Sequence, residues 1–315
     1  MYLPPSSQKE YTYIMNTEQL NAEYAIPGQL KFTQGGGGLP FIEVSTANSK
    51  ALISIYAGQV LSFRPVGEVD DLMFLSEKAY YQTGKAIKGG APVCWPWFGA
   101  DPQGLGRPAH GFVRNRLWNV IATETTASGE IRVTLGLNDT PETLAIWPQS
   151  FTLLLEITVG KSLNLELVTR NTGAQLFPLT QAFHTYFKVG DINQVNVSGL
   201  EGADYIDKVD NSALKKQTGP VVINEEVDRI YLGVRDELVI NDIALKRRIR
   251  IRSGGNKTAV VWNPWAKISA EMADLQDNDY RNLLCVETTN AATDVVEVAP
   301  GRESRLVANY SIEGT

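Results

Sequence analysis

Two neighbouring runs of alternating apolar and polar residues set the strongest constraint on what this chain can fold into. FTLLLEITV (151–159) and LNLELVTR (163–170) are separated by a short link that contains Gly160-Lys161. Alternation places every second side chain on one face, which is typical of a half-buried β-strand. Two such strands joined by a glycine-containing link predict an antiparallel hairpin.

The same pattern recurs along the rest of the chain, and helical signals are few. Two short segments indicate helices, namely PETLAIWP (141–148), which begins and ends with proline, and ISAEMADL (268–275). Strands without alternating long helices argue against a βαβ fold. We therefore expect an all-β protein with few short helices, folded as one large antiparallel β-sandwich. The further strand-like runs are ALISIYAG (51–58), QVLSFRPV (59–66), IRVTLGL (131–137), KTAVVWN (257–263), RNLLCVE (281–287) and SRLVANYSI (304–312).

Charge and apolar patterning exclude several classes of partner. The 29 basic and 35 acidic residues give a net charge of −6, whereas nucleic acids and anionic membranes require a concentrated basic face. No run reaches the ~18 apolar residues of a membrane span, and the start of the chain lacks the pattern of a secretory signal. Cys94 and Cys285 match no metal spacing and are expected to be reduced, buried thiols. We expect a cytoplasmic monomer that binds neither nucleic acid nor membrane.

The chain contains only two histidines, His110 and His184. A lone histidine is more often structural than catalytic, yet imidazole titrates near neutral pH and suits proton transfer. His184 lies in LTQAFHTYFKVGDI (179–192), and His110 lies in the long segment 88–118, which is rich in glycine and proline. Both segments are therefore candidates for a functional site.

Segment 88–118 also carries several aromatic residues, among them three tryptophans, and the cations Lys88, Arg107, Arg114 and Arg116. One interpretation is a well-packed surface loop whose tryptophans fill the end of the sandwich. The other is a binding loop, with aromatic faces for an apolar or sugar face and cations for an anionic group. The residues alone leave both open.

Glu287 is the most distinctive carboxylate, because it ends the apolar run LLCVE. A carboxylate at the end of a buried strand is partly desolvated, which raises its pKa and suits it to act as a base. A strand-end glutamate in solvent is an equally good interpretation. With two histidines and two unpaired cysteines, a catalytic zinc site is not expected. Motifs for dinucleotides, Walker A loops, GxSxG elbows and HExxH sites are absent from the sequence.

Six motifs, taken together and in order, resemble the aldose 1-epimerase superfamily, and most closely its glucose-6-phosphate 1-epimerase branch. The resemblance runs from about residue 30 to the C-terminus and implies a galactose mutarotase-like β-sandwich. We expect residues 29–315 to form that single catalytic domain and residues 1–28 to be an arm or an added edge strand. The motifs are KGGAPVCWPWFG (88–99), PAHGFVRNRLW (108–118), FHTYFKVGDI (183–192), DRIYL (228–232), VVWNPW (260–265) and NLLCVETTNA (282–291).

The resemblance implies an isomerase that interconverts the α and β anomers of a sugar hemiacetal without cofactor or metal. Its carboxylate base corresponds to Glu287 in CVETTN, and its histidine acid to His184 in FHTYF. His110, in AHGFVR, is expected to orient the sugar, and Asp228 matches a position that binds sugar hydroxyls. General acid–base assistance of this kind is typically worth about 10²–10⁴-fold in rate.

The same resemblance implies a phosphate-binding group. The branch carries one arginine in an RGG motif and another in HGxxR. The second is present as Arg114, whereas Lys88 stands in place of the first and lacks its bidentate geometry. Arg107 is a further cation that can compensate. The implied substrate is a small-molecule sugar phosphate.

Three alternative functions stay open. A general aldose 1-epimerase would act on unphosphorylated sugars, although the cations of segment 88–118 argue against a neutral substrate. A non-catalytic carbohydrate-binding or regulatory protein would not need both Glu287 and His184. A glycoside hydrolase would need a second carboxylate near Glu287, for which Asp228 is the candidate. Trp262 and Trp265 are assigned to packing rather than to sugar stacking.

Overall fold

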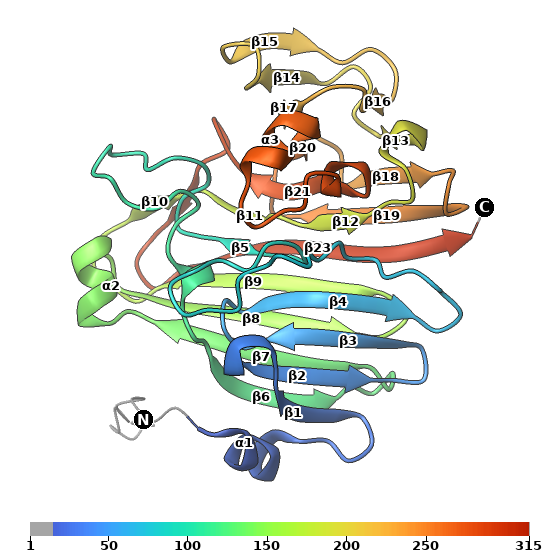
Figure 1. The fold of residues 1–315 in the computed structure, drawn as a ribbon. Helices are drawn as coiled ribbons and strands as arrows, with labels where there is room; N and C mark the ends of the chain where they lie inside the picture. Colours follow the sequence, from blue (N-terminus) through green and yellow to red (C-terminus); the bar gives the residue numbers. More distant parts are fainter. Residues whose placement is uncertain (1–14, 315) are drawn as a thin grey trace.

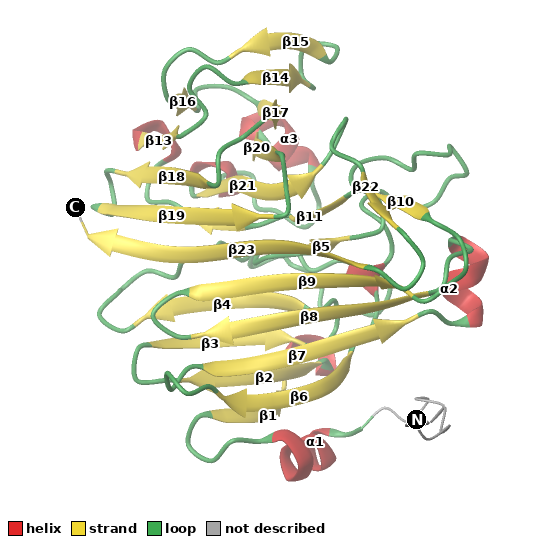
Figure 2. Cartoon of the chain, turned by 180° about the vertical axis from the view of Figure 1, so that it is seen from behind, coloured by secondary structure: helices red, strands yellow, loops and turns green. Residues whose placement is uncertain are grey.

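The computed structural model describes residues 15–314 as two packed layers of β-sheet (Figure 1 and Figure 2). A nine-stranded sheet forms one layer. A four-stranded sheet and an eight-stranded sheet lie side by side over it and form the other layer. Every strand pair in the three sheets is antiparallel, which confirms the predicted all-β antiparallel sandwich.

The nine-stranded sheet has the strand order β16-β13-β18-β19-β23-β9-β8-β7-β6. The predicted hairpin, β8 and β9, lies inside this sheet, and its register runs from Phe151 opposite Asn171 to Val159 opposite Leu163. Its strands are β6 (Asn119–Thr125), β7 (Ile131–Asn138), β8 (Phe151–Val159), β9 (Leu163–Asn171), β13 (Val195–Ser198), β16 (Val221–Val222), β18 (Glu237–Asp242), β19 (Arg247–Gly254) and β23 (Glu303–Gly314).

The eight-stranded sheet carries the candidate site and has the order β15-β14-β17-β20-β21-β11-β5, with β12 also paired to β21. The four-stranded sheet is a simple meander in the order β1-β2-β3-β4. The strands of the eight-stranded sheet are β5 (Val93–Cys94), β11 (Gln181–Phe183), β12 (Tyr186–Lys188), β14 (Asp204–Asp207), β15 (Ala213–Lys216), β17 (Val227–Leu232), β20 (Thr258–Asn263) and β21 (Leu283–Asn290). The strands of the four-stranded sheet are β1 (Leu30–Gln34), β2 (Pro40–Ser45), β3 (Ser49–Ser54) and β4 (Gln59–Pro65).

Helices are short and lie at the margins of the sheets (Figure 2). The described residues form three α-helices, α1 (Thr17–Tyr24), α2 (Pro141–Ile146) and α3 (Trp265–Glu271). They also form four 3₁₀ turns, η1 (Gly36–Gly38), η2 (Val113–Asn115), η3 (Ile192–Gln194) and η4 (Asp279–Arg281), and a two-stranded ribbon of β10 (Phe177–Leu179) and β22 (Val296–Val298). None of the helices within residues 15–314 has the length and apolar character needed to cross a bilayer.

Both predicted helices exist, but one is displaced. The helix predicted over 141–148 is α2, whose Thr140 side chain caps the N-terminus by accepting from the backbone N–H of Thr143. The helix predicted over 268–275 begins at Trp265 and ends at Glu271. It begins early because Asn263 Oδ1 accepts from the Trp265 N–H at 2.8 Å.

The first part of the expected N-terminal arm, residues 1–14, lies outside the described residues. Where the arm is described, it forms helix α1 instead of a strand. Asn16 and Gln19 close a reciprocal capping box at its start, which satisfies free backbone N–H groups. Leu20 then buries its side chain in the core.

The core lies between the two layers and holds the long loop 88–118 against the nine-stranded sheet. The side chains of β8 and β9 alternate between buried and half-buried, so that one face of the hairpin packs inward. Trp95 is fully buried, and its Nε1 donates to Thr169 Oγ1 on β9 at 3.0 Å. Trp118 is buried as well. These two tryptophans fill the sandwich, as the packing interpretation of the loop predicts.

Candidate active site

The pairing of β21 with β11 and β12 places His184 directly opposite Glu287. Phe183 of β11 pairs with Thr288 of β21, and Tyr186 of β12 pairs with Cys285 of β21. Both pairings have the same register, so the two residues between the strands stay aligned with β21. The backbone N–H of His184 does not bond to β21 and donates instead to Pro92 O at 2.9 Å. Its ring is therefore fixed beside the Glu287 carboxylate.

His184 and Glu287 form a buried pair. His184 Nδ1 lies 3.5 Å from Glu287 Oε1, and the two side chains are 11% and 1% exposed. His184 Nδ1 and Glu287 Oε2 are buried without a hydrogen-bond partner within residues 15–314. Because buried polar atoms almost always have partners, these unpaired atoms mark the place where polar groups of a ligand would bind. The structure thus excludes the interpretation of Glu287 as a solvent-exposed strand end.

His110 reaches this pair from the loop 88–118. Its backbone has a φ of +64°, and Gly111 follows with +74°. A Cβ at Gly111 would lie 1.8 Å from Trp95 O, so only glycine fits there. The His110 ring meets the His184 ring edge-to-face at 5.4 Å. Its Nδ1 accepts from the Gly99 N–H at 3.3 Å, which leaves the proton of a neutral His110 on Nε2, free to donate.

Two cations flank the histidines. Arg114, in η2, donates from Nη2 to Ala109 O at 3.0 Å, and its Nε is buried without a partner in the described chain. Lys88 Nζ lies 3.4 Å from Asp274 Oδ1, in the turn after α3. Burial lowers the pKa of His110 and of His184, and the charges of both cations lower it further.

Asp228 approaches from the other side. It lies on β17 opposite Trp262 of β20, and Trp262 in turn lies opposite Cys285 of β21. Glu287 is two residues from Cys285 and therefore faces the same way. Burial raises the pKa of Asp228, and its charge contributes to the raised pKa of Glu287.

Aromatic rings enclose the His184 ring. Tyr186 stacks on it with ring centroids 4.9 Å apart and an interplanar angle of 10°. Trp262 meets it edge-on at 6.1 Å. Tyr186 was not among the predicted site residues, although it lies two residues after His184 on an interrupted strand. Trp262 was predicted to serve packing. Trp262 is only half-buried and borders the site, whereas Trp265 packs against Tyr280.

Burial sets the protonation of the acid–base pair. It raises the pKa of Glu287 well above its ordinary value, with a smaller contribution from Asp228, and Arg114 opposes the shift. It lowers the pKa of His184 well below its ordinary value, and His110, Arg114 and Lys88 add to the shift. Burial also lowers the pKa of His110 to about 3. His110 is therefore neutral, and the pair holds a single proton between its two groups.

The acid–base pair and a neighbouring cysteine together have the residue types of a metal site. His184, Cys285 and Glu287 each offer one ligand atom, and these atoms lie within 4.8 Å of one another. A metal requires the cysteine as thiolate. Burial instead raises the pKa of Cys285 well above its ordinary value, and that of Cys94 to about 12. Both cysteines are buried free thiols, as predicted, and the donor set does not favour a metal.

Arg107 lies in the same loop but is engaged elsewhere. Its guanidinium forms an ion pair and hydrogen bonds with Asp101, donates to Ile146 O at 3.1 Å and lies 4.2 Å over the Trp97 ring. Its three guanidinium nitrogens therefore donate within the protein, two of them to Asp101 in the loop and one to the end of α2. This arrangement favours a structural role in place of the phosphate contact that the sequence analysis considered.

Comparison with known proteins identifies the family of the chain. The aldose 1-epimerase family matches residues 40–311 of the chain. The chain belongs to this family. A relative in Escherichia coli K12 is 40% identical over 256 residues, which cover 81% of this chain and 84% of the relative. A Salmonella typhimurium relative is 37% identical over 273 residues, covering 85% and 90%. Both carry the provisional name glucose-6-phosphate 1-epimerase.

Solved structures show the same fold. YeaD from Salmonella typhimurium, provisionally described as a mutarotase, superposes with a TM-score of 0.86 at 34% identity and covers 93% of this chain and 96% of its own. A galactose mutarotase-like protein from Clostridium acetobutylicum has a TM-score of 0.69 at 14% identity and shows the fold alone. The sandwich is therefore galactose mutarotase-like, and the chain is an enzyme of the mutarotase type.

Proposed function

We propose that this enzyme interconverts the α and β anomers of glucose 6-phosphate, or of a related hexose 6-phosphate, by general acid–base ring opening. The observation that supports the mechanism most strongly is the 3.5 Å separation of His184 Nδ1 and Glu287 Oε1. The hydroxyl oxygen O1 and the ring oxygen O5 of a hemiacetal are bonded to the same carbon, C1. The two groups that exchange protons with them must therefore lie within a few ångströms of each other.

Ring opening balances with one base and one acid. Glu287, as carboxylate, takes the proton of O1–H, and the O1–H electrons form the C1=O1 double bond. The C1–O5 bond breaks, and O5 takes a proton from His184 as imidazolium. Rotation about C1–C2 then presents the other face of the aldehyde. Closure uses the same groups in reversed roles, so the enzyme returns to its starting state.

The single proton of the pair fits this cycle. Burial favours the proton on Glu287 in the free pair, so in this proposal the proton passes to His184 when the sugar binds; after opening Glu287 holds one again and His184 none. The pair is thus charge-separated before the step and neutral after it, and burial favours the neutral form. Closure draws the proton back from Glu287 to O1. No external acid or base is required, and the net charge of the pair stays constant.

The remaining residues position the sugar in this proposal. Neutral His110 donates from Nε2 to a ring substituent or hydroxyl, and Asp228 accepts from hydroxyls on the opposite side. Arg114 binds the 6-phosphate, which gives its unpartnered Nε an acceptor. Lys88 adds charge but shares it with Asp274. The provisional names of the bacterial relatives support the phosphorylated substrate.

A second candidate substrate is an unphosphorylated aldose. The ion pair between Lys88 and Asp274 favours it, because one of the two cations already has a carboxylate partner. The site would then use the same acid–base pair, and only the contact to Arg114 would lack a ligand group. The two substrates therefore share one mechanism and differ in the part played by the cations.

Exchange NMR of the anomeric protons distinguishes these functions. Purified protein is added to equilibrated glucose 6-phosphate, and separately to glucose. Faster α/β exchange with the phosphate ester alone is the expected result, and equal acceleration of both sugars would assign a general aldose epimerase. An absence of acceleration with either sugar would refute the epimerase proposal for these substrates.

A further inference from the structure

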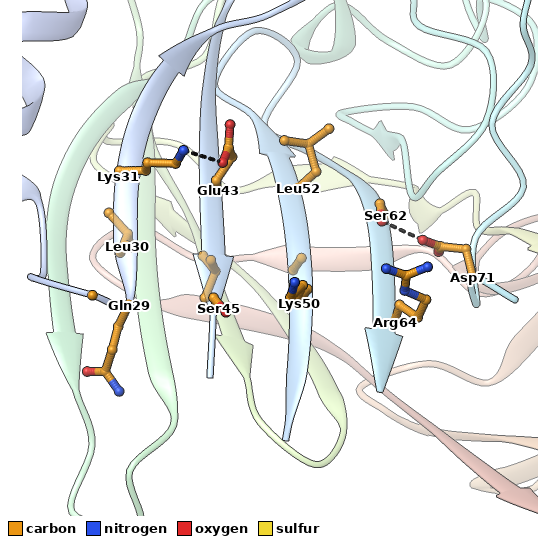
Figure 3. Close-up of a pocket in the computed structure, with 13 residues that line it drawn as sticks. Gln29, Leu30, Lys31, Glu43, Ser45, Lys50, Leu52, Ser62, Arg64 and Asp71 are labelled. Carbon is orange, nitrogen blue, oxygen red and sulfur yellow. Dashed lines mark hydrogen bonds and ion pairs between the residues drawn. The ribbon is translucent and has the colours of Figure 1, made fainter. Parts of the chain in front are cut away.

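The outer face of the four-stranded sheet forms a groove of about 590 Å³, far along the chain from the acid–base pair (Figure 3). The strands alternate: Phe32, Ile42, Val44 and Ile53 bury their side chains in the core, while their neighbours face the groove. The groove is lined by both polar and apolar groups, and the mechanism proposed above makes no use of it.

Three residues form a straight row across adjacent strands of this face. Ser45 of β2 lies opposite Lys50 of β3, and Lys50 lies opposite Arg64 of β4. Directly opposed residues on one face have Cβ atoms about 4.5–5.5 Å apart. We call Ser45, Lys50 and Arg64 the basic row. All three are exposed and line the groove.

The two cations of the basic row are unbalanced. Like charges directly opposite each other repel, and the charged ends of Lys50 and Arg64 form no ion pair or hydrogen bond within residues 15–314. The Asp71 carboxylate also lines the groove, and its hydrogen-bond partners are uncharged.

The acidic groups of the groove are already engaged by other donors. Glu43 pairs with Lys31 at 2.8 Å. The Asp71 carboxylate accepts from the Ser62 hydroxyl and from the backbone N–H groups of Phe63, at 3.0 Å, and Met73, at 2.8 Å. Figure 3 shows Glu43 turned to Lys31 and Asp71 turned to Ser62. The groove therefore offers two free cations and a free hydroxyl, in a protein whose net charge of −6 disfavours unspecific anion binding.

We propose that the basic row binds a phosphate-type oxyanion. A tetrahedral oxyanion has enough acceptor oxygens to take the Arg64 fork, the Lys50 ammonium and the Ser45 hydroxyl together, and its charge removes the repulsion between the two cations. Leu52, half-exposed in the next row, gives apolar surface to the carbon part of a phosphate ester. The ligand is thus either free phosphate or the phosphate group of a small ester. This inference does not depend on the proposed function, because the basic row and the acid–base pair lie on different sheets.

The test uses the full chain and two matched variants. Lys50→Gln combined with Arg64→Gln removes the charges of the basic row, and Lys31→Gln removes the paired cation of the same face. Inorganic phosphate is titrated at constant ionic strength, with chloride as the reference anion, and the amide signals around residues 45, 50 and 64 are followed by NMR. We expect saturable shifts in the wild type and in Lys31→Gln, and binding at least tenfold weaker in the double variant.

Thermal melting separates binding from folding. In chloride the double variant should melt no lower than the wild type, because its substitutions remove a repulsion. Added phosphate should raise the melting temperature of the wild type and of Lys31→Gln, but not that of the double variant. Shifts that do not saturate, that chloride reproduces or that survive in the double variant would overturn the proposal.

A second titration identifies the source of the oxyanion. Glucose 6-phosphate and glucose are added separately to the wild type and to the double variant. Tighter binding of the ester than of inorganic phosphate at the basic row would assign a second sugar-phosphate site, and equal binding would assign free phosphate. Shifts confined to the region of Arg114 would mean that the basic row binds neither ligand, which would refute the proposal.

Discussion

Replacing Glu287 by glutamine should destroy activity and at the same time stabilise the protein at neutral pH. The activity loss follows from the removal of the base and should amount to about 10²–10⁴-fold in kcat. The stability gain follows from burial, which raises the pKa of Glu287 well above its ordinary value of 4.5. Between these two pKa values the folded state keeps a proton that the unfolded state has released, so rising pH destabilises the wild type.

The size of the gain depends on pH and can be worked out with its sign. Each pH unit above 4.5 lowers the wild-type stability through Glu287 by about 1.4 kcal/mol, until its folded pKa is reached. His184 acts in the opposite sense, because its folded pKa is below 6.5 and its protonation in the unfolded state opposes folding at lower pH. The two slopes therefore oppose each other where both groups differ between the folded and unfolded states, and above 6.5, where His184 is neutral in both states, rising pH lowers wild-type stability through Glu287 alone. The glutamine variant lacks the Glu287 slope, so its advantage grows by about 2.7 kcal/mol over two pH units.

Urea unfolding at several pH values between about 5 and 8 measures the difference in unfolding free energy between the glutamine variant and the wild type. Exchange NMR on the same samples measures activity. Glu297→Gln, an exposed glutamate of β22, is the control and should change neither quantity. A gap in unfolding free energy that stays constant with pH would refute the burial argument. A Glu287→Gln variant with normal turnover would refute its role as base.

Two further changes test the other parts of the site, and a third tests the core. His184→Asn should lower kcat by about 10²–10⁴-fold with little change in KM, because it removes the acid. Exchange NMR at several sugar concentrations measures both constants, and an unchanged kcat would show that another group protonates O5. Arg114→Gln should raise KM for glucose 6-phosphate at least tenfold and leave KM for glucose unchanged, and equal effects on the two sugars in matched titrations would remove its phosphate role. Trp95→Phe leaves Thr169 Oγ1 without its donor and should cost about 1–3 kcal/mol in urea unfolding, whereas an unchanged midpoint would mean that the buried hydrogen bond contributes nothing.

Long strands could be predicted from the sequence because alternation needs several residues to become visible. The hairpin of β8 and β9 has nine residues in each strand, and its boundaries matched the prediction closely. The strands β11 and β12 have three residues each and contain no readable period. They exist because β21 offers them a buried edge, which is a property of the assembled sheet.

The candidate site could be predicted by residue but not by environment. Glu287 looked equally compatible with solvent, because the run LLCVE gives no sign that β21 stays buried to its last residue. Arg107 looked available, because nothing in the sequence shows that Asp101 and Trp97 engage it. The same holds for Asp274, whose partner Lys88 lies far away along the chain. Charges reveal their partners only when the fold brings distant segments together.

The register of β21 explains why burial and catalysis coincide in this fold. A single constant register through β11 and β12 is sufficient to bring His184 opposite Glu287, and a slip of one residue would move the carboxylate to the other face. Such a slip would also turn the apolar residues of β21 out of the core, so the energy that fixes the core also fixes the acid–base pair. The pair itself opposes folding at neutral pH, because burial penalises the charged carboxylate. The hydrophobic sheet therefore supplies both the precision that the chemistry needs and the stability that the buried carboxylate removes.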